Sequence, residues 1–255
     1  MFIALGIFAL AFLVISLTDI PENPAQKIET KEKSQYGPMS FRHFVLGAVA
    51  IFIYVGVEVG IPNVLQKWLQ NPELNVLNVT GVGAAEAIAG TVTATYWLLM
   101  LVGRLAGAAL GAKVSAKAML TVASGVGFIF VVLAIFLNPS TVVGLPVFKG
   151  TEGFGIAQVP VNAALLVLCG LCTSVMWGGI FNLAVEGLGK YTERASGIFM
   201  ALVCGGGILP FVQNLVVDLS SNYLVSYWVV AAGLAFLLFY ALAGSKNVNK
   251  DIPVE

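Results

Sequence analysis

The sequence contains few charged residues, and this scarcity excludes most classes of soluble protein. Asp, Glu, Lys and Arg together make up 10% of the 255 residues, and the formal net charge is zero. Soluble domains carry about 25% charged residues. A balanced charge also gives no electrostatic basis for binding nucleic acid. Because 58% of the residues are hydrophobic, more than one soluble core could bury, the sequence predicts an integral membrane protein.

Cysteine and histidine are also scarce, which argues against a disulfide framework, a metal centre and an enzyme. The three cysteines lie inside apolar runs, so no disulfide scaffold is expected. Cys169 and Cys172 have C-x-x-C spacing, but no histidine or further cysteine lies near enough in the sequence to complete a zinc site. No Ser/His/Asp set, paired carboxylates or phosphate-binding loop is present, so we expect neither catalysis nor a cofactor.

Seven apolar stretches approach or exceed the length of about 20 residues that crosses a bilayer as a helix. Strands of a membrane barrel would instead alternate over about ten residues. The Gly- and Pro-rich segment 138–155 predicts an irregular loop. The expected membrane helices are residues 1–18, 44–66, 87–112, 118–137, 159–185, 195–217 and 223–243.

The basic residues fall in alternate connections, which predicts the orientation in the membrane. All Lys and Arg residues except Lys67 and Lys149 lie in or near the polar linker 19–43, the two later connections on the same side, and the tail. The positive-inside rule makes that side cytoplasmic. We therefore expect the N-terminus outside and the C-terminus inside. A signal anchor is the alternative for the first run, which lacks the basic start of a signal peptide.

Glu58 places a carboxylate in the middle of an apolar run, where charge is costly and its persistence suggests function. It lies roughly 21 Å along its helix at 1.5 Å per residue, near the bilayer midplane. Pro62 has no N–H to donate to the carbonyl of Glu58, so we expect a bend and a free acceptor there. Tyr54 is on nearly the same face. This cluster predicts a site for a polar ligand or proton; a structural carboxylate bonded to another helix is the alternative.

The expected helix 195–217 contains a second group of small and polar residues. The carbonyl of Gly206 lacks a partner because of Pro210, which predicts a broken helix. Gln213 and Asn214 follow with amide groups of the kind that bind sugar hydroxyls. An interfacial role for the two amides, and helix packing for the glycines, are the alternatives.

Two tryptophans and several small polar residues could complete a sugar site. Trp177 and Trp97 could stack on a sugar ring, and Asn162, Thr93 and Thr95 could contact its hydroxyls. Packing within or between helices explains each of these residues as well.

Two stretches resemble a known transporter family. The runs FVLGAVAIFIYVGVEVGIPNVLQKWL and MWGGIFNLAVEGLGKYTERASGIFMALVCGGGILPFVQNLVVD are similar to the fucose/galactose/glucose–proton symporters of the major facilitator superfamily. Within them, the Y-V-G-x-E pattern ending at Glu58 resembles that family's first helix of the carboxyl half. Glu186 opens a run that resembles the cytoplasmic loop before its eleventh helix, and Arg104 lies in a segment that resembles its loop between helices eight and nine.

This resemblance implies an all-α integral membrane fold of twelve helices in two halves, of which the chain contains a part. Residues 1–18 then correspond to the last helix of the amino-terminal half, 19–43 to the cytoplasmic linker, 44–245 to the six-helix carboxyl-terminal half, and 246–255 to a cytoplasmic tail. The missing amino-terminal half is an expected partner. Alternating access needs both halves, so we expect the chain to be inactive alone.

The resemblance further implies proton symport of a hexose or 6-deoxyhexose across the inner (cytoplasmic) membrane of a bacterium. The family's protonated carboxylates lie in the absent half, which favours sugar binding over proton transfer for Glu58. A seven-helix receptor, or another membrane protein not involved in transport, is the alternative function. The expected substrate-binding residues are Glu58, Tyr54, Gln213, Asn214, Trp177 and Asn162. The expected gating residues are Pro62, Arg104, Gly206, Pro210 and Glu186.

Overall fold

The computed structural model describes residues 2–18, 36–148, 153–249 and 251–254, which form two compact units, Met1–Gly37 and Pro38–Glu255. The first unit contains α1 (Phe2–Leu17), a helix of 16 residues. At 1.5 Å per residue it is roughly 24 Å long, somewhat short of a bilayer core of about 30 Å. Its described side chains are exposed along its length. Most of the expected linker 19–43 lies outside the described residues.

The second unit confirms the prediction of a helical membrane protein. Six of the seven expected spans appear there as helical segments long and apolar enough to cross a membrane, and the seventh corresponds to the shorter α1. The six segments are Arg42–Gln70, Gly83–Leu110, Ala116–Phe136, Val161–Val185, Gly189–Ser220 and Tyr227–Gly244.

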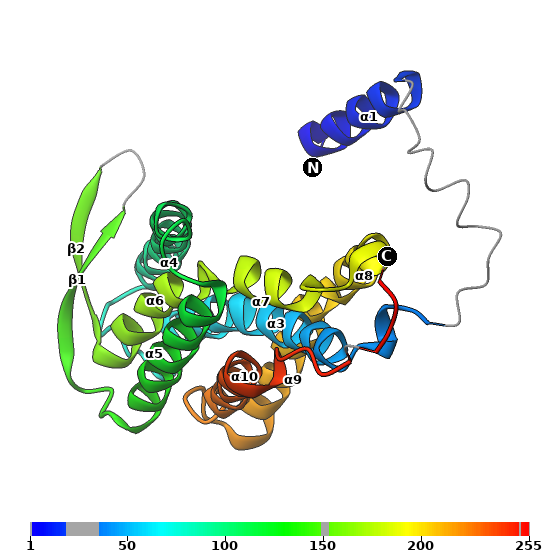
Figure 1. Ribbon diagram of the computed structural model, residues 1–255. Helices are drawn as coiled ribbons and strands as arrows, with labels where there is room; N and C mark the ends of the chain where they lie inside the picture. The colour runs from blue at the N-terminus through cyan, green and yellow to red at the C-terminus, as the bar shows by residue number, and fades with distance from the viewer. Residues whose placement is uncertain (1, 19–35, 149–152, 250, 255) are drawn as a thin grey trace. The chain divides into compact units, whose positions relative to one another are not determined.

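One helix, α3 (Arg42–Gln70), organises this unit because it contacts six other α-helices. It packs most extensively against α4 (Val82–Leu110), α7 (Met176–Val185), α9 (Gly205–Ser220) and α10 (Tyr227–Phe239), as Figure 1 shows, and it also contacts α6 (Val161–Thr173) and α8 (Thr192–Ala201). The remaining helical elements are η1 (Pro38–Ser40), α5 (Ala116–Phe136), η3 (Gly189–Tyr191), η4 (Leu202–Cys204) and η5 (Tyr240–Gly244).

The expectation of an irregular loop at residues 138–155 was wrong, because residues 142–148 and 154–155 belong to the strands of a β-hairpin. Strand β1 (Val142–Phe148) pairs antiparallel with β2 (Phe154–Pro160), with Val142 opposite Pro160 at one end. Alternate residues along the two strands are buried, the pattern of a sheet with one covered face. These residues are Leu145 and Val147 in β1 and Ala157 and Val159 in β2, and Pro160 at the end of β2 is buried as well. Glycine and proline obscured this alternation in the sequence.

The span 161–185 breaks between α6 and α7, although no proline lies at the break. Ser174 and Val175 separate the two helices. The carbonyl of Thr173 accepts a hydrogen bond from a side chain. The hydroxyl of Tyr54, on α3, donates to that carbonyl over 3.1 Å. A residue far away in the sequence therefore stabilises the break, which local signals did not reveal.

The span 189–220 is also interrupted, but at residues 202–204; the break expected from Pro210 was wrong, because α9 continues as a helix through Gly206 and Pro210. The 3₁₀ turn η4 separates α8 from α9. Directly after it, Gly205 lies so close to α3 that an added Cβ would collide with the carbonyl of Phe52. The absence of a side chain at Gly205 thus permits the close packing of α9 on α3.

Candidate functional site

The carbonyl of Glu58 has the free acceptor expected from Pro62, but a neighbouring helix occupies it. α3 continues as a helix through Pro62. The hydroxyl of Tyr96, on α4, donates to the Glu58 carbonyl over 3.0 Å. The same hydroxyl lies 3.1 Å from Oγ1 of Thr173, at the end of α6. Tyr96 therefore joins the proline site of α3 to the break after α6.

The carboxylate of Glu58 forms an ion pair with Arg104, with 2.8 Å between Oε1 and Nη2. The side chain of Glu58 is 11% exposed, whereas that of Arg104 is 53% exposed. Arg104 lies within the last two turns of α4. The family resemblance suggests that it belongs to a loop between two helices, and this expectation was wrong. The long arginine side chain brings its charge to Glu58 from the adjacent helix.

This ion pair lies in the wall of a cavity of about 510 Å³. The cavity is formed by α3, α4, the α6–α7 break, the start of α7 and η4, and its size is in the range of small-molecule sites. A buried carboxylate and a half-exposed guanidinium therefore face one space. Its lining residues are Val55, Glu58, Arg104, Ser174, Trp177, Gly178 and Val203.

Trp177 is fixed in the cavity wall by contacts with two other aromatic rings. Its ring packs edge-on at 6.2 Å from that of Tyr54 and at 6.3 Å from that of Phe199, measured between centroids. Tyr54 is fully buried, and its hydroxyl is engaged by the Thr173 carbonyl. Tyr54 therefore supports Trp177 and the helix break from behind, outside the cavity lining.

Gln213 and Asn214 lie away from the residues that line this cavity. Gln213 is 1% exposed, and its Nε2 is 3.5 Å from Oγ of Ser226, between α9 and the start of α10. Asn214 donates to Oδ1 of Asn63 over 3.1 Å and accepts from Nζ of Lys67 over 2.8 Å. Both amides thus connect helices, and sugar binding by them remains a prediction.

Asn162 is also placed in a contact between helices. It is fully buried, and its Nδ2 donates to the carbonyls of Ala134 and Leu137 over 2.7 and 2.9 Å. These bonds tie the start of α6 to the end of α5. Asn162 does not line the cavity around Glu58.

Three of the expected gating residues, Gly206, Pro210 and Glu186, lie in or after helices that line the cavity or are next to the elements that line it. Gly206 packs near the side chain of Val55, which lines the cavity, and Pro210 is buried one turn later in α9. Glu186 follows α7 with an exposed side chain. Its carbonyl accepts a hydrogen bond from Nε2 of His43 over 3.0 Å. The gating roles themselves remain predictions.

Sequence reasoning missed several residues that complete the site. Ser174, Gly178 and Val203 line the cavity, and Tyr96 and Thr173 form the hydroxyl network behind it. A polar residue inside an apolar span was the available signal for Thr173 and Ser174. Nothing local marked Val203, which reaches the cavity because η4 interrupts the helix there.

Comparison with known proteins shows that the chain is similar to sugar transporters. No family model matches the chain. The glucose/galactose transporter of Brucella abortus is 32% identical over 246 residues, 96% of this chain and 52% of that protein. A putative glucose/galactose transporter of Helicobacter pylori is 30% identical, over 96% of this chain and 54% of its own. The L-fucose-proton symporter of Escherichia coli is 22% identical, over 95% of this chain and 51% of that protein.

A solved structure decides the fold. The crystal structure of a major facilitator superfamily transporter, FucP, in the outward conformation superposes with a TM-score of 0.64 and 20% identity, covering 94% of this chain and 52% of that one. The chain has the fold of half a major facilitator superfamily transporter. It spans about half the length of the curated relatives it matches. Those relatives are transporters, which confirms the expectation of a multi-pass membrane protein that is not an enzyme.

Proposed function

We propose that this chain is the carboxyl-terminal part of a proton-coupled transporter for hexoses or 6-deoxyhexoses in a bacterial cytoplasmic membrane. An amino-terminal half supplies the other wall of the pathway, and the chain alone does not transport. The observation that carries the proposal is the Glu58–Arg104 ion pair in a cavity wall. The names of the relatives supply the class of sugar, and no cofactor other than the proton is needed.

The ion pair has the hydrogen-bonding capacity that a sugar requires. Each sugar hydroxyl both donates and accepts, a carboxylate only accepts, and a guanidinium only donates. Glu58 and Arg104 can therefore bind neighbouring hydroxyls with opposite roles, and such charge-assisted bonds are stronger than neutral ones. Trp177 supplies an aromatic surface in the same cavity for the apolar face of the ring.

The difference in exposure between the two partners suits a site that must open and close. Glu58 is held in the helix wall, whereas the half-exposed Arg104 has room to exchange its carboxylate partner for a sugar hydroxyl. Val203, in the interruption between α8 and α9, lines the same cavity. A change at this interruption, with Gly206 and Pro210 beside it, would reach the bound sugar directly, as rocking about a midplane site requires.

The test joins the chain to its amino-terminal half, in one reading frame or by coexpression, in cells that lack other hexose transporters. Uptake of labelled glucose, galactose and fucose is measured for wild type, Glu58→Gln and the control Glu73→Gln, whose carboxylate is exposed in the α3–α4 connection. Loss of one charge-assisted bond costs about 1.5–3 kcal/mol, so we expect sugar affinity to fall roughly 10- to 100-fold for Glu58→Gln alone.

Two results would contradict the proposal at different levels. Unchanged affinity and uptake in Glu58→Gln would remove this residue from the site. Uptake of none of the three sugars by the rejoined wild type would reject the substrate class. Proton coupling is tested separately in unbuffered cell suspensions, where sugar addition should raise the external pH and replacement of sodium should leave uptake unchanged.

A further inference from the structure

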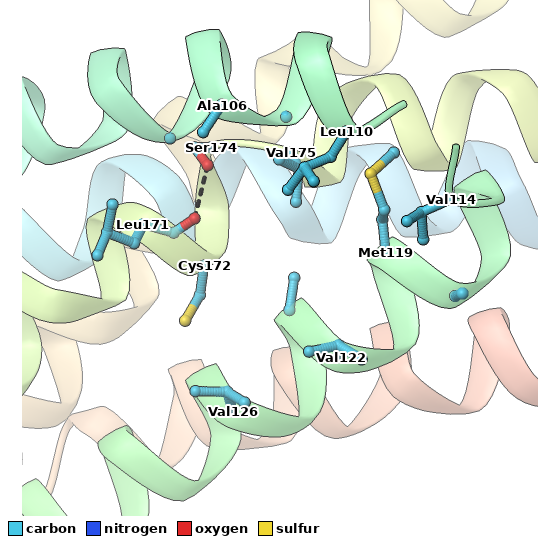
Figure 2. A pocket seen from close by; sticks show the side chains of 14 residues that line it. Ala106, Leu110, Val114, Met119, Val122, Val126, Leu171, Cys172, Ser174 and Val175 are labelled. Atoms are coloured by element: carbon cyan, nitrogen blue, oxygen red, sulfur yellow. Dashed lines mark hydrogen bonds between the residues drawn. The ribbon is translucent and has the colours of Figure 1, made fainter. Parts of the chain in front are cut away.

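A second cavity, of about 440 Å³, lies between α4, α5 and α6 and has an almost wholly apolar lining. Figure 2 shows Leu110, Val114 and Met119 around one end of it, and Leu171 and Cys172 around the other. Ser174 is the residue that this lining shares with the cavity around Glu58. The two spaces therefore have different walls and different chemistry.

The walls of this cavity reach the outside of the unit and offer no polar partner to a ligand. Leu110 is 53% exposed, Val122 is 64% exposed and Leu171 is 40% exposed. The hydroxyl of Ser174 is already bonded to the carbonyl of Leu171, the dashed line in Figure 2. A sugar would lose its hydrogen bonds here, whereas a hydrocarbon chain would lose none.

Two lysines directly precede residues that line this apolar space. Lys113 directly precedes Val114, and Lys117 directly precedes Ala118, both of which line the cavity. The two lysines are exposed. The sequence from residue 111 to residue 117 contains neither Asp nor Glu. A positively charged rim thus adjoins a hydrophobic interior.

We propose that this cavity holds an acyl chain of an anionic phospholipid, with the headgroup phosphate bound by Lys113 and Lys117. The positive-inside rule assigns this end of α4 and α5 to the cytoplasmic side, where anionic lipids attract basic residues beside membrane helices. A soluble anion would leave the apolar cavity empty, and a neutral lipid would leave the rim unpaired. The anionic phospholipid satisfies both.

The test uses the purified, delipidated chain and adds back phosphatidylglycerol or phosphatidylcholine with the same acyl chains. Bound lipid is counted by native mass spectrometry over a titration. Each lysine near an anionic membrane contributes about fivefold in affinity, so we expect about a 30-fold preference for phosphatidylglycerol. In Lys113→Gln/Lys117→Gln this preference should disappear, whereas Lys246→Gln, an exposed lysine in the tail on the same side, should keep it.

A matched pair of alanine substitutions tests the apolar part. Ala106 lines the cavity, whereas Ala109, one turn along the same helix, is exposed and outside the lining. We expect Ala106→Leu to weaken phosphatidylglycerol binding at least tenfold and Ala109→Leu to leave it unchanged. Monodispersity by size exclusion confirms that each variant is folded.

Three outcomes would overturn the proposal. Equal retention of the two lipids by wild type would exclude binding of the headgroup by the charged rim. An unaltered preference in the double lysine variant would place the headgroup elsewhere. Equal binding by the two alanine variants would exclude the cavity as the position of the acyl chain.

Discussion

The two partners of the ion pair should not be equally costly to remove, because they differ in exposure. Arg104→Gln leaves the carboxylate of Glu58, whose side chain is 11% exposed, without its charged partner. Glu58→Gln leaves a guanidinium whose side chain is 53% exposed and which water can solvate. We therefore expect Arg104→Gln to destabilise the protein more than Glu58→Gln does.

The exposure of the two side chains limits how much the two substitutions can differ in their effect on stability. Breaking a fully buried pair by removing one partner costs about 3–5 kcal/mol, and exposed pairs contribute about 0–1 kcal/mol. With one buried and one half-exposed partner, Arg104→Gln should cost about 2 kcal/mol and Glu58→Gln about 1 kcal/mol or less. For a chain of this length 1 kcal/mol corresponds to about 2–4 °C, so the melting temperatures should fall by about 4–8 °C and by at most about 4 °C.

The assay is thermal unfolding of the purified chain in one detergent, followed by tryptophan fluorescence. The double variant Glu58→Gln/Arg104→Gln closes a thermodynamic cycle and should lose less than the sum of the single variants, because the charges interact directly. Arg194→Gln, an exposed arginine in α8, controls for general charge loss. An equal or larger loss in Glu58→Gln, or strict additivity, would refute the reasoning.

Three further substitutions test contacts that hold the helices around the cavity, each measured by thermal unfolding. Tyr96→Phe removes a buried hydroxyl that bonds an α3 carbonyl and a threonine, and should cost about 1–3 kcal/mol; wild-type stability would contradict that network. Gly205→Ala should destabilise because its Cβ meets the backbone of α3, whereas Gly207→Ala has open space; equal effects would exclude the close contact. Asn162→Ala should cost a similar 1–3 kcal/mol by freeing two carbonyls at the end of α5, and a neutral result would show that these bonds contribute little.

Much of the fold could be predicted because hydropathy along the chain reports directly on membrane helices. Six of the seven expected spans are present at about the expected positions, although the sixth is interrupted at residues 202–204 and not at Pro210. The hairpin at residues 142–160 was missed because its alternation is short and includes Gly144 and Pro146. A short alternation of apolar and polar residues is a weak signal for a strand, because the register is specified only where one face of the sheet is buried against a neighbouring surface.

The candidate site could be predicted only in part. Glu58, Pro62 and Trp177 were identified from their unusual settings, but the pairing of Glu58 with Arg104 was not. Asn162 had the same polar character in the sequence and proved to bond the end of α5. Residue type alone did not separate a side chain facing a cavity from one bonded between helices.

The sequence by itself determined that this protein lies in a membrane, how its helices are spaced, and that a carboxylate lies deep within one of them. These properties depend on the free-energy cost of placing polar groups in lipid. The residues of each segment set that cost by themselves, without contacts to other segments. Only the tertiary structure decided that Arg104 pairs with Glu58, that Tyr54 and Tyr96 donate to the carbonyls of Thr173 and Glu58, and which residues enclose each cavity. Such contacts join residues far apart in the chain, and packing between helices alone brings them within reach of one another.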